Sequence, residues 1–168
     1  MSTIKVSNIQ DIANNAAMSM SNGVVTFNNA PVGLPANITT RTTVASTSGT
    51  AIDFTGIPST AKRISVIFRG VSSAGSDTGA LVQLGTSGGV QASGYLSTSH
   101  YGGGGSSDAT GFYWYGTGGG NILSGIMTIA HMGSNSYVNA HSGKYNSSNG
   151  MFGGGDVSLG GTLDRVRI

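Results

Sequence analysis

The chain of 168 residues contains no cysteine and no glutamate. The absence of cysteine excludes disulfide bridges and metal sites built from thiolates. The absence of glutamate leaves six aspartates as the only acidic side chains, whereas glycoside hydrolysis normally uses a pair of Asp or Glu side chains. We therefore expect a protein that is not an enzyme and that holds no metal or other cofactor.

Charge of either sign is scarce, since only 8% of the residues are charged, compared with about a quarter in ordinary domains. The eight basic residues are scattered along the chain, so the clustered basic surface typical of a nucleic-acid-binding protein is missing. No stretch approaches 18 apolar residues, and the N-terminus shows no apolar signal region. We therefore expect no nucleic-acid partner and no membrane insertion. A surface so poor in charge indicates that sister copies cover part of it.

What the sequence does contain is 29 glycines between short runs of β-branched and aromatic residues. In residues 62–69, Ile64, Val66 and Phe68 alternate with mostly polar residues, which is the period of a strand with one buried face. Such runs recur every 8–14 residues or so, with turn residues between them, and this spacing predicts an all-β fold, an antiparallel sandwich or jelly roll. The predicted strands of this region are 38–44, 51–54, 63–69, 80–84, 90–96, 110–115, 122–132, 137–140, 156–159 and 163–168.

The run 122–132 is apolar on both faces. Ile122, Ile126 and Ala130 share one face of the predicted strand, and Leu123, Met127 and Ile129 share the other. A strand of this kind is typically buried on both sides. We expect one face to lie in the subunit core and the other against a partner copy.

Two domains are predicted, with residues 1–35 as a leader and linker and residues 36–168 as the β-sandwich domain. Residues 3–9 form a short strand candidate, and residues 11–18 form either one helical turn or coil. Asn22-Gly23 is typical of a hairpin turn leading into Val24–Phe27. Pro31, Gly33 and Pro35 then interrupt the pattern. The leader has too few large apolar residues to hold a core alone, so it requires a neighbour.

Five segments together resemble the receptor-side domain and the leader of tailed-bacteriophage tail fibres. They are residues 1–10 with 21–35, residues 50–70, residues 79–96, residues 123–132 and residues 161–168. The resemblance implies a homotrimeric virion protein whose leader docks to a tail or baseplate protein and whose β domain binds a glycan or protein of the host surface. One departure is that the resembling proteins continue past the last strand, whereas this sequence stops at Ile168.

The resemblance leaves two alternatives to a tail fibre open. One is a capsid decoration or neck appendage protein, and the other is a glycan-degrading tailspike in which aspartates of different copies pair. It also assigns the leader's apolar side chains to virion attachment. These attachment candidates are Ile4, Val6, Ile9, Val24 and Phe27.

Glycine clusters lie at 102–105, 118–120 and 153–155, and they flank Tyr101 and the aromatic run 112–115. They are interpreted either as flexible connections at one end of the sandwich or as packed extended runs that shape a binding tip. Phe112 and Trp114 share one strand face and are expected in the core. Tyr101, Tyr113 and Tyr115 are the candidates for receptor contact, because an aromatic ring can stack on the apolar face of a sugar.

Three further patterns are weak. Residues 85–89 match the G-x-S-x-G pattern of a hydrolase nucleophile, but the next run predicts a strand where that motif needs a helix. His100, His131 and His141 fit no metal-ligand spacing and are expected to be structural. Asp77 and Asp108 lie in Gly/Ser loops, where Asp usually forms local turn hydrogen bonds.

Overall fold

The computed structural model describes residues 8–10, 16–21, 24–27, 38–45, 51–72, 79–116 and 119–168. The chain divides into two compact units, Met1–Thr43 and Val44–Ile168, and the boundary predicted near residue 36 falls within the first of them. The described residues are all-β, with antiparallel strands and no helix. Among them there is accordingly no helix long and apolar enough to cross a membrane.

The first unit contains a three-stranded sheet in the order β1 (Asn8–Gln10), β2 (Ala16–Ser21) and β3 (Val24–Phe27). Ser21 pairs with Val24, so the connection between β2 and β3 is the two residues predicted as a hairpin turn. Residues 16–18, which end the segment 11–18 predicted as a helical turn or coil, belong to strand β2 instead. Of the attachment candidates, Ile9 lies in β1, Val24 and Phe27 lie in β3, and Ile4 and Val6 lie outside the described residues.

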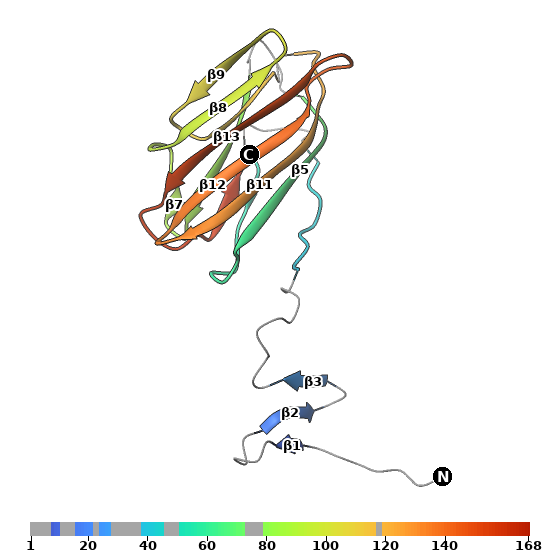
Figure 1. Cartoon of the computed structure of the whole chain (residues 1–168), viewed down its shortest axis with the longest axis vertical. Helices are drawn as coiled ribbons and strands as arrows, with labels where there is room; N and C mark the ends of the chain where they lie inside the picture. Colours follow the sequence, from blue (N-terminus) through green and yellow to red (C-terminus); the bar gives the residue numbers. More distant parts are fainter. Residues whose placement is uncertain are drawn as a thin grey trace, which may run out of the picture. The chain divides into compact units, whose positions relative to one another are not determined.

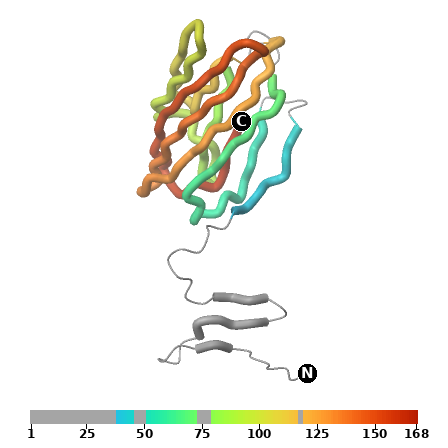
Figure 2. The backbone as a smooth tube through the Cα atoms, turned by 45° about the vertical axis from the view of Figure 1, so that its right-hand side comes forward, coloured from blue at the N-terminus to red at the C-terminus, as the bar shows by residue number. Residues whose placement is uncertain are grey.

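The second unit, here called the body, holds two antiparallel sheets that face each other (Figures 1 and 2). The five-stranded sheet has the order β10 (Phe112–Tyr115), β6 (Gly79–Thr86), β14 (Arg165–Arg167) and β4 (Asp53–Phe54), and β7 (Gly89–Val90) pairs with β6. The six-stranded sheet has the order β5 (Arg63–Val71), β11 (Leu123–Gly133), β12 (Ser136–Lys144), β13 (Gly150–Ser158), β8 (Leu96–Tyr101) and β9 (Gly104–Asp108). This arrangement is consistent with the predicted sandwich.

The core lies between the two sheets, because alternate residues of each strand point inward. Phe112 and Trp114 of β10 are fully buried there, as predicted. Buried side chains of the five-stranded sheet include Val82, Leu84 and Val166, and those of the six-stranded sheet include Phe68, Leu123, Met127, Ile129, Tyr137, Met151 and Val157.

The two strands with the clearest apolar pattern are confirmed. In β5, Ile64, Val66 and Phe68 are partly or fully buried, and the residues between them are exposed. In β11, Leu123, Met127 and Ile129 are buried, as expected for the core face. Ile126 lies on the other face and is exposed, with Ile122 exposed just before the strand begins.

Two predicted strands are wrong. Residues 38–45 form no strand and are exposed, although their β-branched composition favoured one. Residues 91–95 are irregular, and the strand β8 begins only at Leu96. Tyr95 explains the irregular path, since its ring is buried and its hydroxyl accepts the Leu84 N–H at 2.7 Å. Local β propensity was outweighed by a tertiary hydrogen bond.

Two strands rich in glycine and serine were missed as strands. β9 and most of β13 were interpreted as connections, yet Gly153, Gly154 and Gly155 lie in the middle of β13 between β12 and β8. A Cβ atom on Gly153 would overlap the His141 imidazole and the Thr98 carbonyl oxygen. Glycine is therefore needed here for a close approach of a side chain and not for a turn.

We expect Gly153→Ala to destabilise the body by about 1–3 kcal/mol, because the added methyl group must displace the buried His141 ring. Gly150→Ala is the matched control in the same strand, where an added Cβ meets only ordinary contact with the Gly143 carbonyl oxygen. The free energy of unfolding from urea titration measures both variants. Equal stability of the two variants would contradict this packing.

Candidate functional site

Three connections gather at one end of the body, here called the loop end (Figure 1). They are the β8–β9 turn at Gly102 and Gly103, the β10–β11 connection with its described residues 116 and 119–122, and residues 145–149 between β12 and β13. Strand ends bring Tyr101 and Tyr115 to the same place. Loops on a rigid two-sheet scaffold are common positions for binding residues.

Tyrosine side chains form a cluster at the loop end. Tyr101 and Tyr115 stack with ring centroids 4.8 Å apart and an interplanar angle of 13°. Tyr145 meets the Tyr101 ring edge-on at 5.1 Å, and Tyr113 meets Tyr115 edge-on at 6.0 Å. Hydrogen bonding with Tyr101 raises the pKa of Tyr115 above its ordinary value. We call Tyr101, Tyr113, Tyr115 and Tyr145 the tyrosine cluster.

Glycine allows these rings to lie directly on the backbone. A Cβ atom on Gly79 would overlap the Tyr113 ring, and one on Gly116 would overlap the Tyr145 ring. Gly116 also has a φ of +93°, a backbone conformation that other residues rarely adopt. The glycines beside the aromatic residues therefore set the positions of the rings.

The three predicted contact residues are brought together but are not equally accessible. Tyr101 and Tyr115 are partly exposed, whereas Tyr113 is only 9% exposed. Tyr113 is therefore mainly a packing residue in this structure. Tyr145 was missed, because it lies 30 residues after Tyr115 and only the pairing of β11, β12 and β13 brings it alongside.

A buried polar network fixes the strand that carries Tyr113 and Tyr115. β10 is an edge strand, and its free N–H groups donate across to the other sheet, Tyr113 N to Ser97 Oγ at 2.8 Å and Tyr115 N to Ser99 Oγ at 3.3 Å. Ser99 Oγ also lies 3.1 Å from His141 Nε2. The backbone N–H groups of two residues on this sheet edge thus have acceptors, although no further strand pairs with β10.

His141 links this network to the core. Its Nδ1 lies 2.9 Å from Asn139 Oδ1, and its ring stacks on Trp114 at 4.9 Å. Because Asn139 Oδ1 can only accept, Nδ1 carries the proton of the neutral imidazole, and Nε2 then accepts the Ser99 hydroxyl. Burial lowers the pKa of His141 to about 4, so the ring is neutral at pH 7.

Ser99, His141 and Asn139 have hydrogen-bond connections like those of a serine hydrolase triad. Ser99 is 0% exposed, however, and its hydroxyl is already engaged by the backbone of β10. A substrate has no access to it in this structure. The three residues lie in the six-stranded sheet, and the Tyr115 N–H to Ser99 bond joins them to the other sheet. They could not be found from the sequence, because β8 and β12 become neighbours of β13 only through the sheet pairing.

The weak motifs of the sequence have local structural roles. The G-x-S-x-G segment is the hairpin of β6 and β7, with no helix after Ser87. Asp108 Oδ1 accepts the Thr110 N–H at 2.6 Å, which is the expected turn hydrogen bond, and Asp77 lies outside the described residues. Asp53 accepts two hydrogen bonds from Arg167 at 2.7 and 2.8 Å, which lower the pKa of Asp53.

The histidines are dispersed. His100 stacks on Phe152 on the exposed side of the six-stranded sheet, and His131 stacks on Tyr137. No group of three His, Cys, Asp or Glu residues that could hold a metal ion occurs within residues 38–45, 51–72, 79–116 and 119–168.

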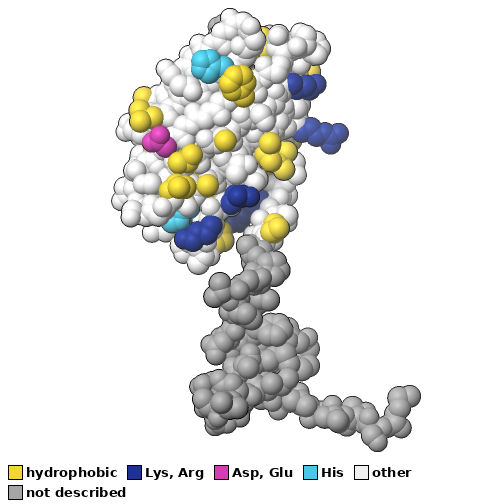
Figure 3. Space-filling view, viewed as in Figure 1, with side chains coloured by type: hydrophobic (Ala, Val, Ile, Leu, Met, Phe, Trp, Pro, Cys, Tyr) yellow, Lys and Arg dark blue, Asp and Glu magenta, His cyan; other side chains and the backbone are white. Residues whose placement is uncertain are grey.

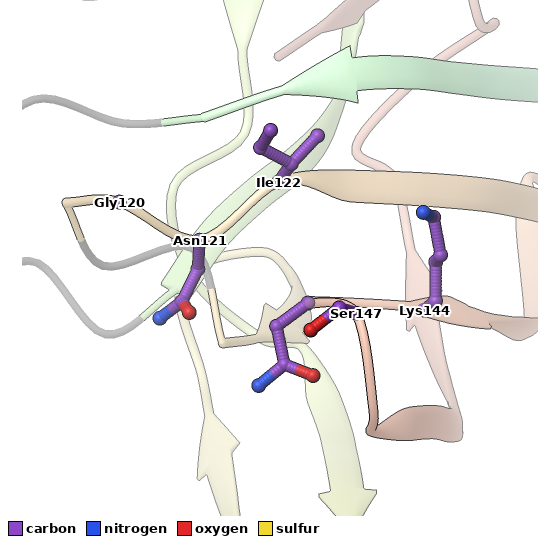
Figure 4. Close-up of a pocket in the computed structure, with 6 residues that line it drawn as sticks. Gly120, Asn121, Ile122, Lys144 and Ser147 are labelled. Atoms are coloured by element: carbon purple, nitrogen blue, oxygen red, sulfur yellow. The ribbon is translucent and has the colours of Figure 1, made fainter.

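A shallow cavity of about 420 Å³ lies beside the β12–β13 turn, which begins at Tyr145 of the tyrosine cluster. Figure 4 shows its lining, in which Asn121 and Ile122 come from the segment just before β11, and Lys144 and Ser147 come from the end of β12 and the turn after it. Gly120 and Asn146 complete the lining. The lining thus contains amide, hydroxyl, ammonium and apolar groups, which is a surface suited to a polar ligand.

The outward side of the six-stranded sheet, here called the outer face, exposes large apolar side chains (Figure 3). Ile67 is 74% exposed and Phe152 is 64% exposed. The other large apolar residues exposed on this sheet are Leu96, Ile126, Met132 and Val138. Lys and Arg side chains gather in two groups near opposite ends of this face.

No protein-family model, no curated protein and no solved structure matches this chain.

We expect acid to destabilise the body through His141. The folded pKa of about 4 is below the ordinary value of about 6.5, so the unfolded chain binds the proton more readily. The stability is fully present above pH 6.5 and falls between pH 6.5 and 4, by roughly 2–3 kcal/mol at pH 4.5. The free energy of unfolding at pH 7 and 4.5 measures it.

The His141→Gln variant should lack this part of the pH dependence, even if it is less stable at pH 7. His100→Gln, a change on the exposed side of the sheet, is the control and should keep it. A pH dependence that is the same in His141→Gln as in the unchanged protein would contradict the role of the buried ring.

Proposed function

We propose that this chain is a structural and binding protein of a tailed-bacteriophage virion, a tail fibre. In this proposal the N-terminal leader docks to a tail or baseplate protein, and the body presents its loop end to the host cell surface. The observation that carries the proposal is the tyrosine cluster beside a polar cavity, both at the loop end of a two-sheet body.

The chemistry of the loop end supports recognition of a host surface glycan. Tyr101 and Tyr115 are partly exposed rings held in place by packing, so stacking on a sugar costs little side-chain entropy. Asn121 and Ser147 add groups that can hydrogen-bond to sugar hydroxyls. Binding at one such site is expected to be modest, and several copies on one particle increase the overall strength by avidity.

The outer face supports association of the body with further copies of the same chain. It is the side of β11 that the sequence indicated as buried against a partner, and it exposes Ile126. Arg63 of β5 and Asp156 of β13 lie in one row across the sheet. Arg63 pairs with Ala130, Ala130 pairs with Val138, and Val138 pairs with Asp156. In a threefold arrangement with the outer faces turned toward the axis, β5 of each copy lies beside β13 of the next, which brings these unlike charges together at every contact.

The division of labour between leader and body is tested with two variants in assembled particles. Deletion of residues 1–35 should abolish incorporation into particles while the purified body still unfolds cooperatively. Tyr101→Ala should be incorporated normally but slow the adsorption of particles to host cells about tenfold, because one stacking ring is lost. Thr162→Ala, at an exposed position on the β13–β14 connection, is the control.

Immunogold labelling of the same particles gives the location of the protein. Label at the tail, loss of label with the deletion and slow adsorption of Tyr101→Ala agree with the proposal. Label on the capsid or neck would favour the decoration protein instead. Incorporation of the truncated chain would contradict docking by the leader.

Self-association through the outer face is tested by mass measurement in solution. We expect the full-length protein to form a homo-oligomer, and three copies is the number that the resemblance implies. Phe152→Asp places a charge within the apolar face and should shift the mass to that of the monomer. Thr55→Asp, a change of the same charge at an exposed position outside that face, should leave the oligomer intact. A monomeric unchanged protein would contradict the proposal.

A further inference from the structure

The cavity at the loop end presents more hydrogen-bond donors than acceptors. The Asn146 side-chain oxygen is occupied by its own turn, since it accepts the Ser148 N–H at 2.9 Å and the Asn149 N–H at 2.6 Å. Both of these donors are backbone N–H groups, so the atom facing them is the oxygen and the amide NH2 is the group left to the cavity. Asn146 therefore contributes donors to the lining.

Lys144 adds a positive charge to this lining. It is exposed, and the ion pairs formed by the described residues are Asp53 with Arg167 and Asp164 with Arg165. Within that part of the chain, the Lys144 ammonium has no carboxylate partner. None of the six residues that line the cavity is acidic.

A second cation lies in the same row of the sheet. Ser124 of β11 pairs with Lys144 on one side and with Arg69 of β5 on the other. Neighbouring strands are about 4.8 Å apart, so Lys144 and Arg69 are on the order of 10 Å apart across Ser124. The cavity is thus one end of a positively charged strip, and the apolar Ile122 borders it.

We propose that this cavity binds the carboxylate group of an acidic saccharide. The Lys144 ammonium binds the carboxylate, Asn121, Asn146 and Ser147 bind ring hydroxyls, and Ile122 contacts the apolar face of the sugar. One ammonium with neutral donors suits a singly charged carboxylate, whereas phosphate is more typically bound by an Arg fork or a set of backbone N–H groups. The inference rests on the proposed function and names the class of glycan.

The experiment measures binding of the full-length protein to immobilised polygalacturonate, with the uncharged polymer dextran as reference. We expect binding to polygalacturonate only, with an affinity that falls as sodium chloride is raised. Lys144→Gln should weaken binding about tenfold or more, because a hydrogen bond to a charged group is lost. Asn121→Ala should weaken it a few-fold. Lys62→Gln, the same change at the opposite end of the outer face, should have no effect.

Inorganic phosphate is added as a competitor to separate the two anions. Binding that persists in millimolar phosphate and is lost in Lys144→Gln supports the proposal. Binding that phosphate displaces, dextran binding that Lys144→Gln leaves unchanged, or no binding to either polymer overturns it. The tail-fibre proposal is tested separately, by incorporation of the chain into particles and by labelling. The acidic-saccharide proposal can therefore fail while the tail-fibre proposal stands.

Discussion

The constraint on which the rest of the body depends is the satisfaction of the open edge of β10. This strand lies at the edge of one sheet, and its N–H groups find acceptors in the buried Ser97 and Ser99 hydroxyls of the other sheet. A buried N–H group without an acceptor costs about 1–3 kcal/mol, so these contacts favour one relative position of the two sheets. His141 extends the network to Asn139, and its ring fills the space that Gly153 leaves open.

The loop end takes its geometry from this junction. Tyr115 is positioned by its own backbone N–H, and it then stacks on Tyr101 from β8, the strand that supplies the serine acceptors. Tyr145 contacts Tyr101 edge-on, and its neighbour Lys144 lines the cavity. The aromatic cluster and the hydrogen-bond donors of the cavity therefore lie on adjacent parts of one scaffold. That combination suits a glycan that offers both an apolar ring face and a charged group, and it is the physical basis of the two proposals on binding.

The strands that could be predicted from the sequence are those with large apolar residues on alternate positions. β5 and β11 are examples, and the core face of β11 carries the buried Met127 as expected, while Ile126 on its other face is exposed in the single chain. β9 and β13 could not be predicted in the same way, because glycine and serine carry no hydrophobic pattern. Their pairing is supported by the neighbouring strands, and in β13 the absence of side chains is itself the requirement for packing against His141.

By itself, the sequence determined an all-β antiparallel fold, the burial of Phe112 and Trp114 and the candidacy of Tyr101 and Tyr115. These follow from the alternation of residues along one strand, which is a local property. Only the tertiary structure decided that Tyr113 is covered, that Tyr145 joins the cluster and that Lys144 lines a cavity with Asn121. The reason is that these positions depend on which strands pair and which sheet edges meet, and such long-range choices are made by the whole set of buried contacts and hydrogen bonds together.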